Sequence, residues 1–332
     1  MMTAIVAPAC ADGPAPTTNE VVRMTDLKPR KMDFGFDDGD VPFLWNPDNP
    51  AWSSMSNAVS FLAIGFEKMI VKLILQAKPL ITDPAVAEEA VAFMRQEGHH
   101  STAHRQHVNG LIRSYPGLQN TLDAVIGEFD LLTDRTSIDY RLAYTADLEA
   151  TFTPVFKLML DNEATLFAPG DDRVASLFLW HFVEEVEHRS SALIIYNSVV
   201  GNELYRMRMA PSVFAHVMKS IRIACAGFNQ HVPLSERKVD SMSMFARHRA
   251  KQRVLTAFAP YLTKGPMPRA FDGLPIGEQL VALRGAVRSQ LPGHDPTHEN
   301  LPVLADEWFG RYDGGADCTR WYSAASVPSE VN

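Results

Sequence analysis

Two pairs of residues in this sequence have the side-chain types and the spacing of metal ligands. Glu97 and His100 form one Glu-x-x-His pair, and Glu185 and His188 form the other. In a helix, residues three apart lie on one face at neighbouring heights, so the carboxylate and the imidazole of a pair can share a metal ion. Mixed carboxylate and imidazole ligands suit first-row transition metals. The two pairs therefore predict a metal centre, and helices must position it.

Two further glutamates lie where a free carboxylate would be costly. Glu67 lies in the apolar run LAIGFEKMIVKLIL, and Glu149 follows Leu148 and precedes Ala150. Burial of a carboxylate without a partner is strongly unfavourable, so burial implies an ion pair or a metal. One Glu from each of two helices, with Glu-x-x-His from each of two others, is the ligand set of ferritin-like di-iron or di-manganese bundles. We therefore expect all four glutamates to face one interior.

Two more histidines extend the same helix faces. His104 follows His100 by four residues, and His181 precedes Glu185 by four. Each could bind metal directly or hold a ligand in place from behind. Because imidazole is a poor ligand for Mg²⁺ and Ca²⁺, this set favours two iron ions, with manganese or zinc as alternatives. Glu184 competes with Glu185 for the same role, and we favour Glu185 because it completes Glu-x-x-His.

The elements that carry these residues are predicted to be helices. Apolar residues recur every three or four positions through the middle of the chain, and no alternating segment of length competes with them. The fold class is therefore all-α. The four long helices are expected at about 52–77, 84–113, 138–167 and 173–199, with further helices at about 118–132, 205–228, 235–262 and 276–289.

The spacing of the glutamates fits two antiparallel helix hairpins. The midpoint of positions 67 and 97 is 82, inside the break between Pro79 and Pro84. The midpoint of positions 149 and 185 is 167, close to Pro169-Gly170, whereas the rival Glu163 would move it to 174, inside the fourth helix. We therefore prefer Glu149. We expect a ferritin-like four-helix bundle with additional C-terminal helices and extended arms at both ends of the chain.

Composition bounds the class of protein. The 332 residues are 46% hydrophobic and 21% charged, as in a packed globular protein. A formal charge of -8 argues against nucleic acid as a partner. The three isolated cysteines form no C-x-x-C pair, which fits a reducing cytoplasm. We expect no secretion signal and no transmembrane segment, since the longest apolar run is short and interrupted by charges.

Proline-rich ends divide the chain into three parts. Residues 1–50 are expected to form an extended or partly disordered arm, residues 51–262 the helical metal-binding domain, and residues 263–332 a C-terminal helix and a wrapping tail. The aromatic residues of the first part are expected to dock on the helical body: Phe34, Phe36, Phe43 and Trp45.

Over about residues 35–300 the chain resembles the ferritin-like proteins known as predicted metal-dependent hydrolases, some of which behave as non-haem di-iron monooxygenases. The resemblance depends on four segments: SNAVSFLAIGFEKMI, AFMRQEGHHSTAHRQHVN, DLEATFTP and LFLWHFVEEVEHRSSALIIYN. They contain all eight candidate ligands. One departure precedes Glu67, where LAIGFEKMI replaces the more usual proline-glycine of the family.

The leading hypothesis for function is a non-haem di-iron oxygenase, an O₂-activating hydroxylase of a hydrophobic small molecule. Apolar helix faces around the ligands suggest that substrate, and Pro154 could open the third long helix near the metals. This chemistry requires O₂ as co-substrate and an external electron donor, a reductase or a ferredoxin. The alternatives are a dinuclear metal-dependent hydrolase and a non-catalytic iron- or metal-binding bundle. A homodimer is compatible with the sequence, and no catalytic residue beyond the ligands is assigned.

Overall fold

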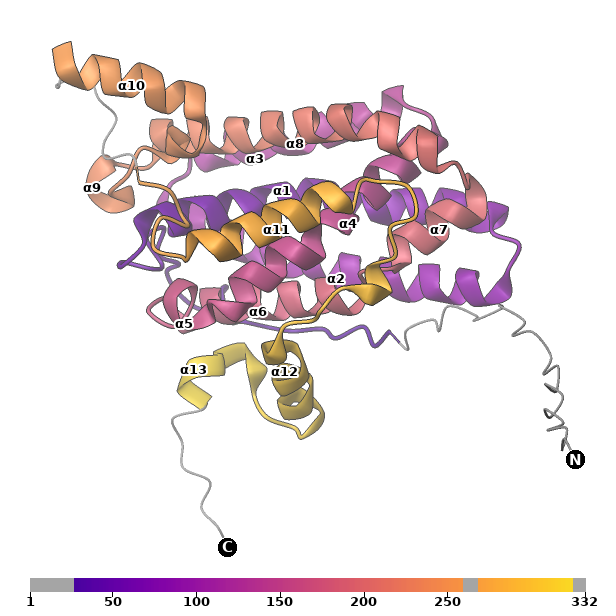
Figure 1. Ribbon diagram of the computed structural model, residues 1–332. Coiled ribbons are helices and arrows are strands. Elements are labelled where there is room, and N and C mark those ends of the chain that lie inside the picture. The colour runs from indigo at the N-terminus through magenta and orange to yellow at the C-terminus, as the bar shows by residue number, and fades with distance from the viewer. Residues whose placement is uncertain (1–26, 259–267, 325–332) are drawn as a thin grey trace, which may run out of the picture.

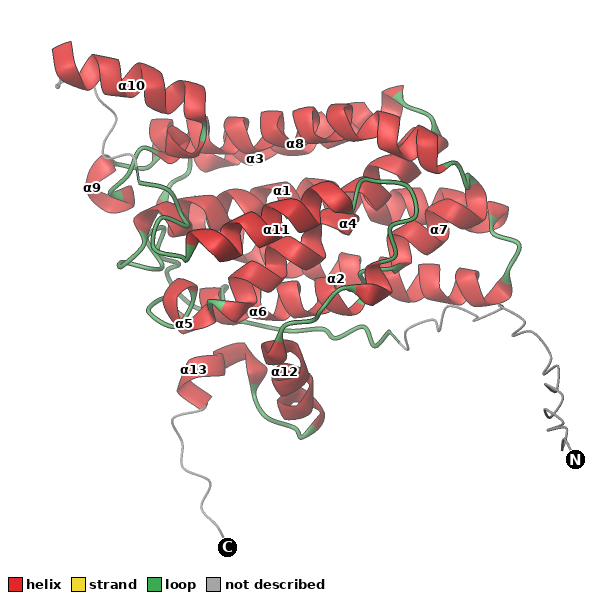
Figure 2. Cartoon of the chain, in the orientation of Figure 1, coloured by secondary structure: helices red, strands yellow, loops and turns green. Residues whose placement is uncertain are grey.

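The computed structural model describes residues 27–258 and 268–324. Throughout these residues the regular structure is helical and no strand occurs, so the prediction of an all-α fold is confirmed (Figure 2). Within the same ranges, no helix combines the length and the apolar character that a membrane crossing requires.

Four long helices carry seven of the eight candidate ligands, and His188 directly follows the fourth of them. Helix α1 contacts α2 and α4, and α6 also contacts α2 and α4, so the four surround one interior. Each begins with a polar side chain that accepts a hydrogen bond from a backbone N–H of the first turn, which favours a helix start at that residue. The helices and these first residues are α1 (Pro50–Ala77) after Asn49, α2 (Pro84–Ser114) after Asp83, α4 (Ile138–Asp161) after Ser137 and α6 (Asp172–Glu187) after Asp171.

The remaining helices cover this group of four. Helices α3 (Leu118–Arg135) and α8 (Glu203–His231) lie along α1 on one side, and α12 (Val303–Asp313) lies on the opposite side against α6 and α4 (Figure 1). Helix α11 (Ile276–Arg288) packs on α4. The shorter helices are α5 (Glu163–Leu166), α7 (Ser191–Val199), α9 (Leu234–Arg237), α10 (Ala246–Phe258) and α13 (Trp321–Ala324).

The segment from residue 27 to residue 49 is extended and packs against the helices. Its aromatic side chains Phe34, Phe36, Phe43 and Trp45 are all at most 2% exposed, as expected from the sequence. The backbone carbonyl of Trp45 accepts a hydrogen bond from the N–H of Asp171, which immediately precedes α6. The segment is therefore part of the core rather than a loose end.

Three predicted helices are interrupted in the structure. The helix expected at 138–167 ends at Asp161, and the short helix α5 follows it. The helix expected at 235–262 is instead α9, a short 3₁₀ turn at Ser241–Met244 and α10, with residues 259–262 outside the described part. The helix expected at 173–199 ends at Glu187, and α7 begins at Ser191. At this break Arg189 donates to the carbonyl of Val186, so a side chain satisfies a carbonyl that the helix leaves free. His188 therefore lies at the end of α6 rather than inside a longer helix.

Candidate metal centre

Seven of the eight candidate ligands converge in the interior enclosed by α1, α2, α4 and α6. They form two groups of four, and within each group one potential ligand atom from every residue lies within 4.8 Å of the others. Every member is at most 3% exposed. The first group is Glu67, His100, His181 and Glu185, and the second is Glu97, Glu149, Glu185 and His188.

Glu185 belongs to both groups. Its Oε1 lies 2.8 Å from Nε2 of His181, and its Oε2 lies 3.1 Å from Nε2 of His188. The two oxygens of one carboxylate therefore face different histidines. A carboxylate in this position can bridge two metal ions, as in the dinuclear sites of helical bundles.

The two Glu-x-x-His pairs are used differently from one another. Glu185 and His188 lie in the same group, whereas Glu97 and His100 lie in different groups. Oε1 of Glu97 is 3.2 Å from Nε2 of His188, and Nδ1 of His100 is 3.6 Å from Oε1 of Glu185. The expectation that each pair shares one metal ion therefore fits only the second pair, and α2 contributes to both groups.

The donor atoms fit metal ions because most have no other partner. Among the described residues, no hydrogen bond reaches either carboxylate oxygen of Glu97 or Glu149, Oε2 of Glu67, or Nδ1 of His100, although all are buried. Buried polar atoms are nearly always paired, so such a concentration in one place requires an explanation. Divalent cations bound by these oxygens and nitrogens would satisfy them.

The pKa values of the four glutamates in the centre also favour a bound cation. Burial, reinforced by the charge of Glu185, raises the pKa of Glu149 to about 8 and raises the pKa values of Glu67 and Glu97 well above their usual range. Glu185 is equally buried, but the contacts with His188 and His181 outweigh that burial and hold its pKa well below the usual range. Without a cation the centre therefore retains protons on its crowded carboxylates.

His104, also proposed as a ligand from the sequence, lies behind the first group rather than in it. Its Nε2 is 2.7 Å from Nδ1 of His181, and its Nδ1 is 2.9 Å from the hydroxyl of Ser60. This contact leaves Nε2 of His181 facing Glu185 and Glu67. His104 is thus placed to fix the orientation of a ligand histidine.

The other two histidines of the groups are held in the same way. Nε2 of His100 lies 2.9 Å from Oε2 of Glu184, and Nδ1 of His188 lies 3.1 Å from Oε1 of Gln96. Glu184, which competed with Glu185 in the sequence, therefore supports His100 from outside the two groups. All three histidines present one nitrogen to the centre and use the other for a hydrogen bond.

Sequence reasoning missed several of these supporting residues. Ser60 precedes Glu67 by seven residues, two helical turns, so helical spacing could have identified it. Gln96 directly precedes Glu97, but nothing in its type indicated a role. The rival Glu163 lies in α5 and accepts a hydrogen bond from the hydroxyl of Tyr322, away from both groups.

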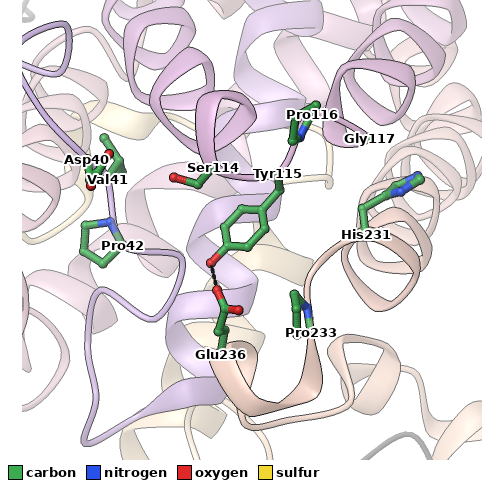
Figure 3. Close-up of a pocket in the computed structure, with 10 residues that line it drawn as sticks. All are labelled: Asp40, Val41, Pro42, Ser114, Tyr115, Pro116, Gly117, His231, Pro233 and Glu236. Atoms are coloured by element: carbon green, nitrogen blue, oxygen red, sulfur yellow. Dashed lines mark hydrogen bonds between the residues drawn. The ribbon is translucent and has the colours of Figure 1, made fainter.

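A separate surface pocket of about 570 Å³ lies where the extended segment meets the end of α2 and the end of α8 (Figure 3). The hydroxyl of Tyr115 donates to Glu236 across it, and His231 lies on its wall. No member of the two ligand groups lines this pocket. The concentration of metal-ligating chemistry is therefore in the buried centre.

Comparison with known proteins gives one family. Its sequence model, described as "Predicted metal-dependent hydrolase", matches residues 28–272, most of the chain and all the ligand groups. No curated protein and no solved structure matches the chain. The ferritin-like relation therefore remains a prediction.

This match corrects the leading functional hypothesis. The prediction of an O₂-activating oxygenase is wrong, because the family is one of metal-dependent hydrolases and nothing in the comparison supports oxygenase chemistry. The error has a physical cause: the same carboxylate and histidine set can serve redox chemistry or Lewis-acid hydrolysis, so ligand types alone do not decide. The alternative, a metal-dependent hydrolase, is favoured instead. The chain belongs to the family of predicted metal-dependent hydrolases.

Proposed function

We propose that this protein is a metal-dependent hydrolase whose centre would hold two metal ions, with Glu185 shared by the two groups of ligands. The observation that carries the proposal is the position of Glu185 between two groups of buried ligand atoms, most of which have no hydrogen bond, within a chain of a metal-dependent family. A single-ion site would leave one of the groups without a partner for its carboxylates.

One ion would be held by Glu67, His100, His181 and Glu185, and the other by Glu97, Glu149, Glu185 and His188. The oxygen and imidazole donors fit iron, manganese or zinc. Two such ions supply Lewis acidity toward a carbonyl or phosphoryl oxygen and lower the pKa of water.

The protein's own residues would orient the ligands and exclude bulk water. His104, Glu184 and Gln96 fix three imidazole rings, so their free nitrogens are directed before an ion arrives. Hydrolysis needs neither O₂ nor an electron donor.

The surroundings of the first group favour a hydrophobic small molecule as substrate. The rings of Phe156 and Phe182 stack with centroids 4.1 Å apart, and the Phe156 ring lies 6.3 Å from that of His181. Phe152 extends this aromatic cluster, stacked on Phe156. Aromatic side chains beside a few polar groups are typical of small-molecule sites.

The buried free thiols Cys225 and Cys318 fit the proposed cytoplasmic location.

The test is hydrolysis by the metal-loaded protein in water enriched in ¹⁸O. Chromogenic carboxylic and phosphoric esters with apolar groups serve as probes, with iron, manganese and zinc each loaded in turn. We expect ¹⁸O in the product, loss of activity on chelation, and equal rates with and without O₂. Glu185→Gln should abolish turnover, whereas Glu163→Gln, outside both groups, should retain it. Turnover that survives chelation, or that requires O₂, would contradict the proposal.

A further inference from the structure

Arg30 is a buried cation in the extended segment that precedes α1. It is 4% exposed, and its guanidinium meets two carboxylates near the end of α6. Nη1 donates to Oε1 of Glu184 and to Oε2 of Glu187, both at 2.9 Å, and Nη2 donates to Oε1 of Glu187 at 3.0 Å. A buried guanidinium with this many charge-assisted contacts is held in one orientation.

The two carboxylates lead from Arg30 to one histidine of each ligand group. Glu184 accepts from Arg30 through Oε1 and lies 2.9 Å from Nε2 of His100 through Oε2. Glu187 accepts from Nε2 of Gln96 at 2.6 Å, and Oε1 of Gln96 lies 3.1 Å from Nδ1 of His188. A single guanidinium therefore supports the first group through His100 and the second through His188.

These contacts decide which nitrogen of each imidazole ring faces the metal centre. Nε2 of His100 is occupied by its contact with Oε2 of Glu184, so Nδ1 is the nitrogen that faces the centre. Because the amide of Gln96 donates to Glu187, its oxygen faces His188, so Nδ1 of His188 carries the proton and Nε2 faces the carboxylates of the centre. Without Arg30, Glu184 and Glu187 would be crowded carboxylates with no cation, and the amide of Gln96 would lose its fixed direction.

Arg30 is itself clamped by the C-terminal part of the chain. Its Cζ lies 4.6 Å from the ring centroid of Phe309, 5.5 Å from that of Tyr312 and 6.0 Å from that of Trp308, all on α12. Cations over aromatic faces at such distances are stabilised, most strongly when water is excluded. The extended segment and α12 thus meet at the residue that supports the centre.

We propose that Arg30 is a positioning residue of the dinuclear centre, which sets the rings of His100 and His188 through Glu184, Glu187 and Gln96. The proposal rests on the proposed metal centre. It assigns a role to the extended segment and to α12, which contribute no residue to either ligand group.

The test uses full-length protein loaded with Co²⁺, whose visible absorption reports the geometry and the ligands of the ion. In Arg30→Gln we expect Co²⁺ affinity to fall about 10- to 100-fold, with altered visible bands. Arg30→Lys should be intermediate, because an ammonium cannot hold both carboxylates with the geometry of the guanidinium fork.

Arg113→Gln is the matched control. Arg113 donates to the backbone carbonyls of Phe36 and Gly39, so it anchors the same extended segment but contacts neither Glu184 nor Glu187 in the described structure. We expect this variant to lower the melting temperature and to leave the Co²⁺ spectrum and affinity unchanged. A purely structural role for Arg30 would give the same result as Arg113.

The outcomes separate this proposal from the proposed function. Unchanged spectrum and affinity in Arg30→Gln, with two Co²⁺ ions in the unmodified protein, would overturn the role of Arg30 and leave the centre standing. Failure of the unmodified protein to bind Co²⁺ would overturn the centre itself. If Arg30→Gln does not fold, Phe309→Leu removes one ring of the clamp, and we expect a smaller spectral change; no change would overturn the proposal.

Discussion

Glu185 is the residue on which both ligand groups depend. It shares the first with Glu67, His100 and His181, and the second with Glu97, Glu149 and His188. We therefore predict that Glu185→Ala loses both metal ions, whereas Glu67→Gln weakens only the first site and Glu97→Gln only the second. Elemental analysis after gel filtration measures the ions that each variant retains. Two ions retained in Glu185→Ala would mean that the groups do not share this carboxylate.

Because several carboxylates are crowded in the centre, the stability of the metal-free protein depends on pH. Glu149 titrates near 4.5 in an unfolded chain and at about 8 when buried, so between these values the folded state holds more protons. Its contribution to stability is complete below 4.5 and is lost as pH rises through about 8, at about 1.4 kcal/mol per pH unit. Glu67 and Glu97 are raised in the same direction.

Buried histidines limit the pH range over which this loss of stability can be measured. Burial lowers the pKa values of His100 and His104, so they oppose folding below about 6.5, where the unfolded chain takes up protons. We therefore predict that the melting temperature of metal-free protein falls between pH 6.5 and 8.5. Metal-loaded protein should not follow this fall, because bound ions take the place of the protons. Glu149→Gln should reduce the slope; a metal-free melting temperature that rises across this range would contradict the account.

His104 gives a prediction for the residues behind the ligands. Because its Nε2 holds Nδ1 of His181, His104→Ala should weaken metal binding in the first group by about 10- to 100-fold. His107→Ala is the control, since His107 bonds the same Ser60 hydroxyl and lies outside both groups. Titration with Mn²⁺ or Zn²⁺ measures both variants. Equal metal affinities of the His104→Ala and His107→Ala variants would contradict the orienting role of His104.

At the scale of single residues, the sequence predicted which side chains lie together. It did not predict which ligand group each one joins or which ones support the ligands. Helical spacing was enough to bring seven ligands to one interior, because a helix fixes which residues lie on a face. It could not tell Glu184 from Glu185, or show that Glu97 and His100 belong to different groups. Those choices depend on side-chain contacts with other helices, and Arg30 lies in an extended segment that has no periodicity to interpret.

At the scale of elements, local capping signals mark helix starts, whereas the ends of α4 and α6 were not predicted. Asn49 and Asp83 each precede a proline and mark the starts of α1 and α2, as local capping chemistry requires. No proline or glycine follows Glu187 that would predict a break in the helix there. It depends on side-chain bonds such as that of Arg189, which periodicity does not record.

The docking of the extended segment on α2 can be tested at Gly110. A Cβ at this position would meet the side chain of Val41 too closely for contact, so Gly110→Ala should displace the segment despite the helix propensity of alanine. We expect a loss on the order of 1–3 kcal/mol in urea unfolding. Gly127→Ala in α3 meets nothing within 4 Å and should stabilise by about 0.5–1 kcal/mol. A stabilising Gly110→Ala would show that the segment does not pack there.

At the scale of the whole molecule, the fold class and the family followed from the sequence, but the reaction did not. Helical periodicity and the two Glu-x-x-His pairs predicted an all-α metal protein, and the match over residues 28–272 agrees with the family. The oxygenase hypothesis was wrong because one ligand set serves several chemistries. The molecule also joins parts that the sequence separates: the extended segment and α12 meet at Arg30 behind the centre.

The most direct test of the dinuclear centre is anomalous X-ray scattering from crystals of the full-length protein loaded with zinc or manganese. The account predicts two anomalous peaks per chain, one among Glu67, His100 and His181 and the other among Glu97, Glu149 and His188, with Glu185 between them. A single peak, or peaks outside these two groups, would contradict it.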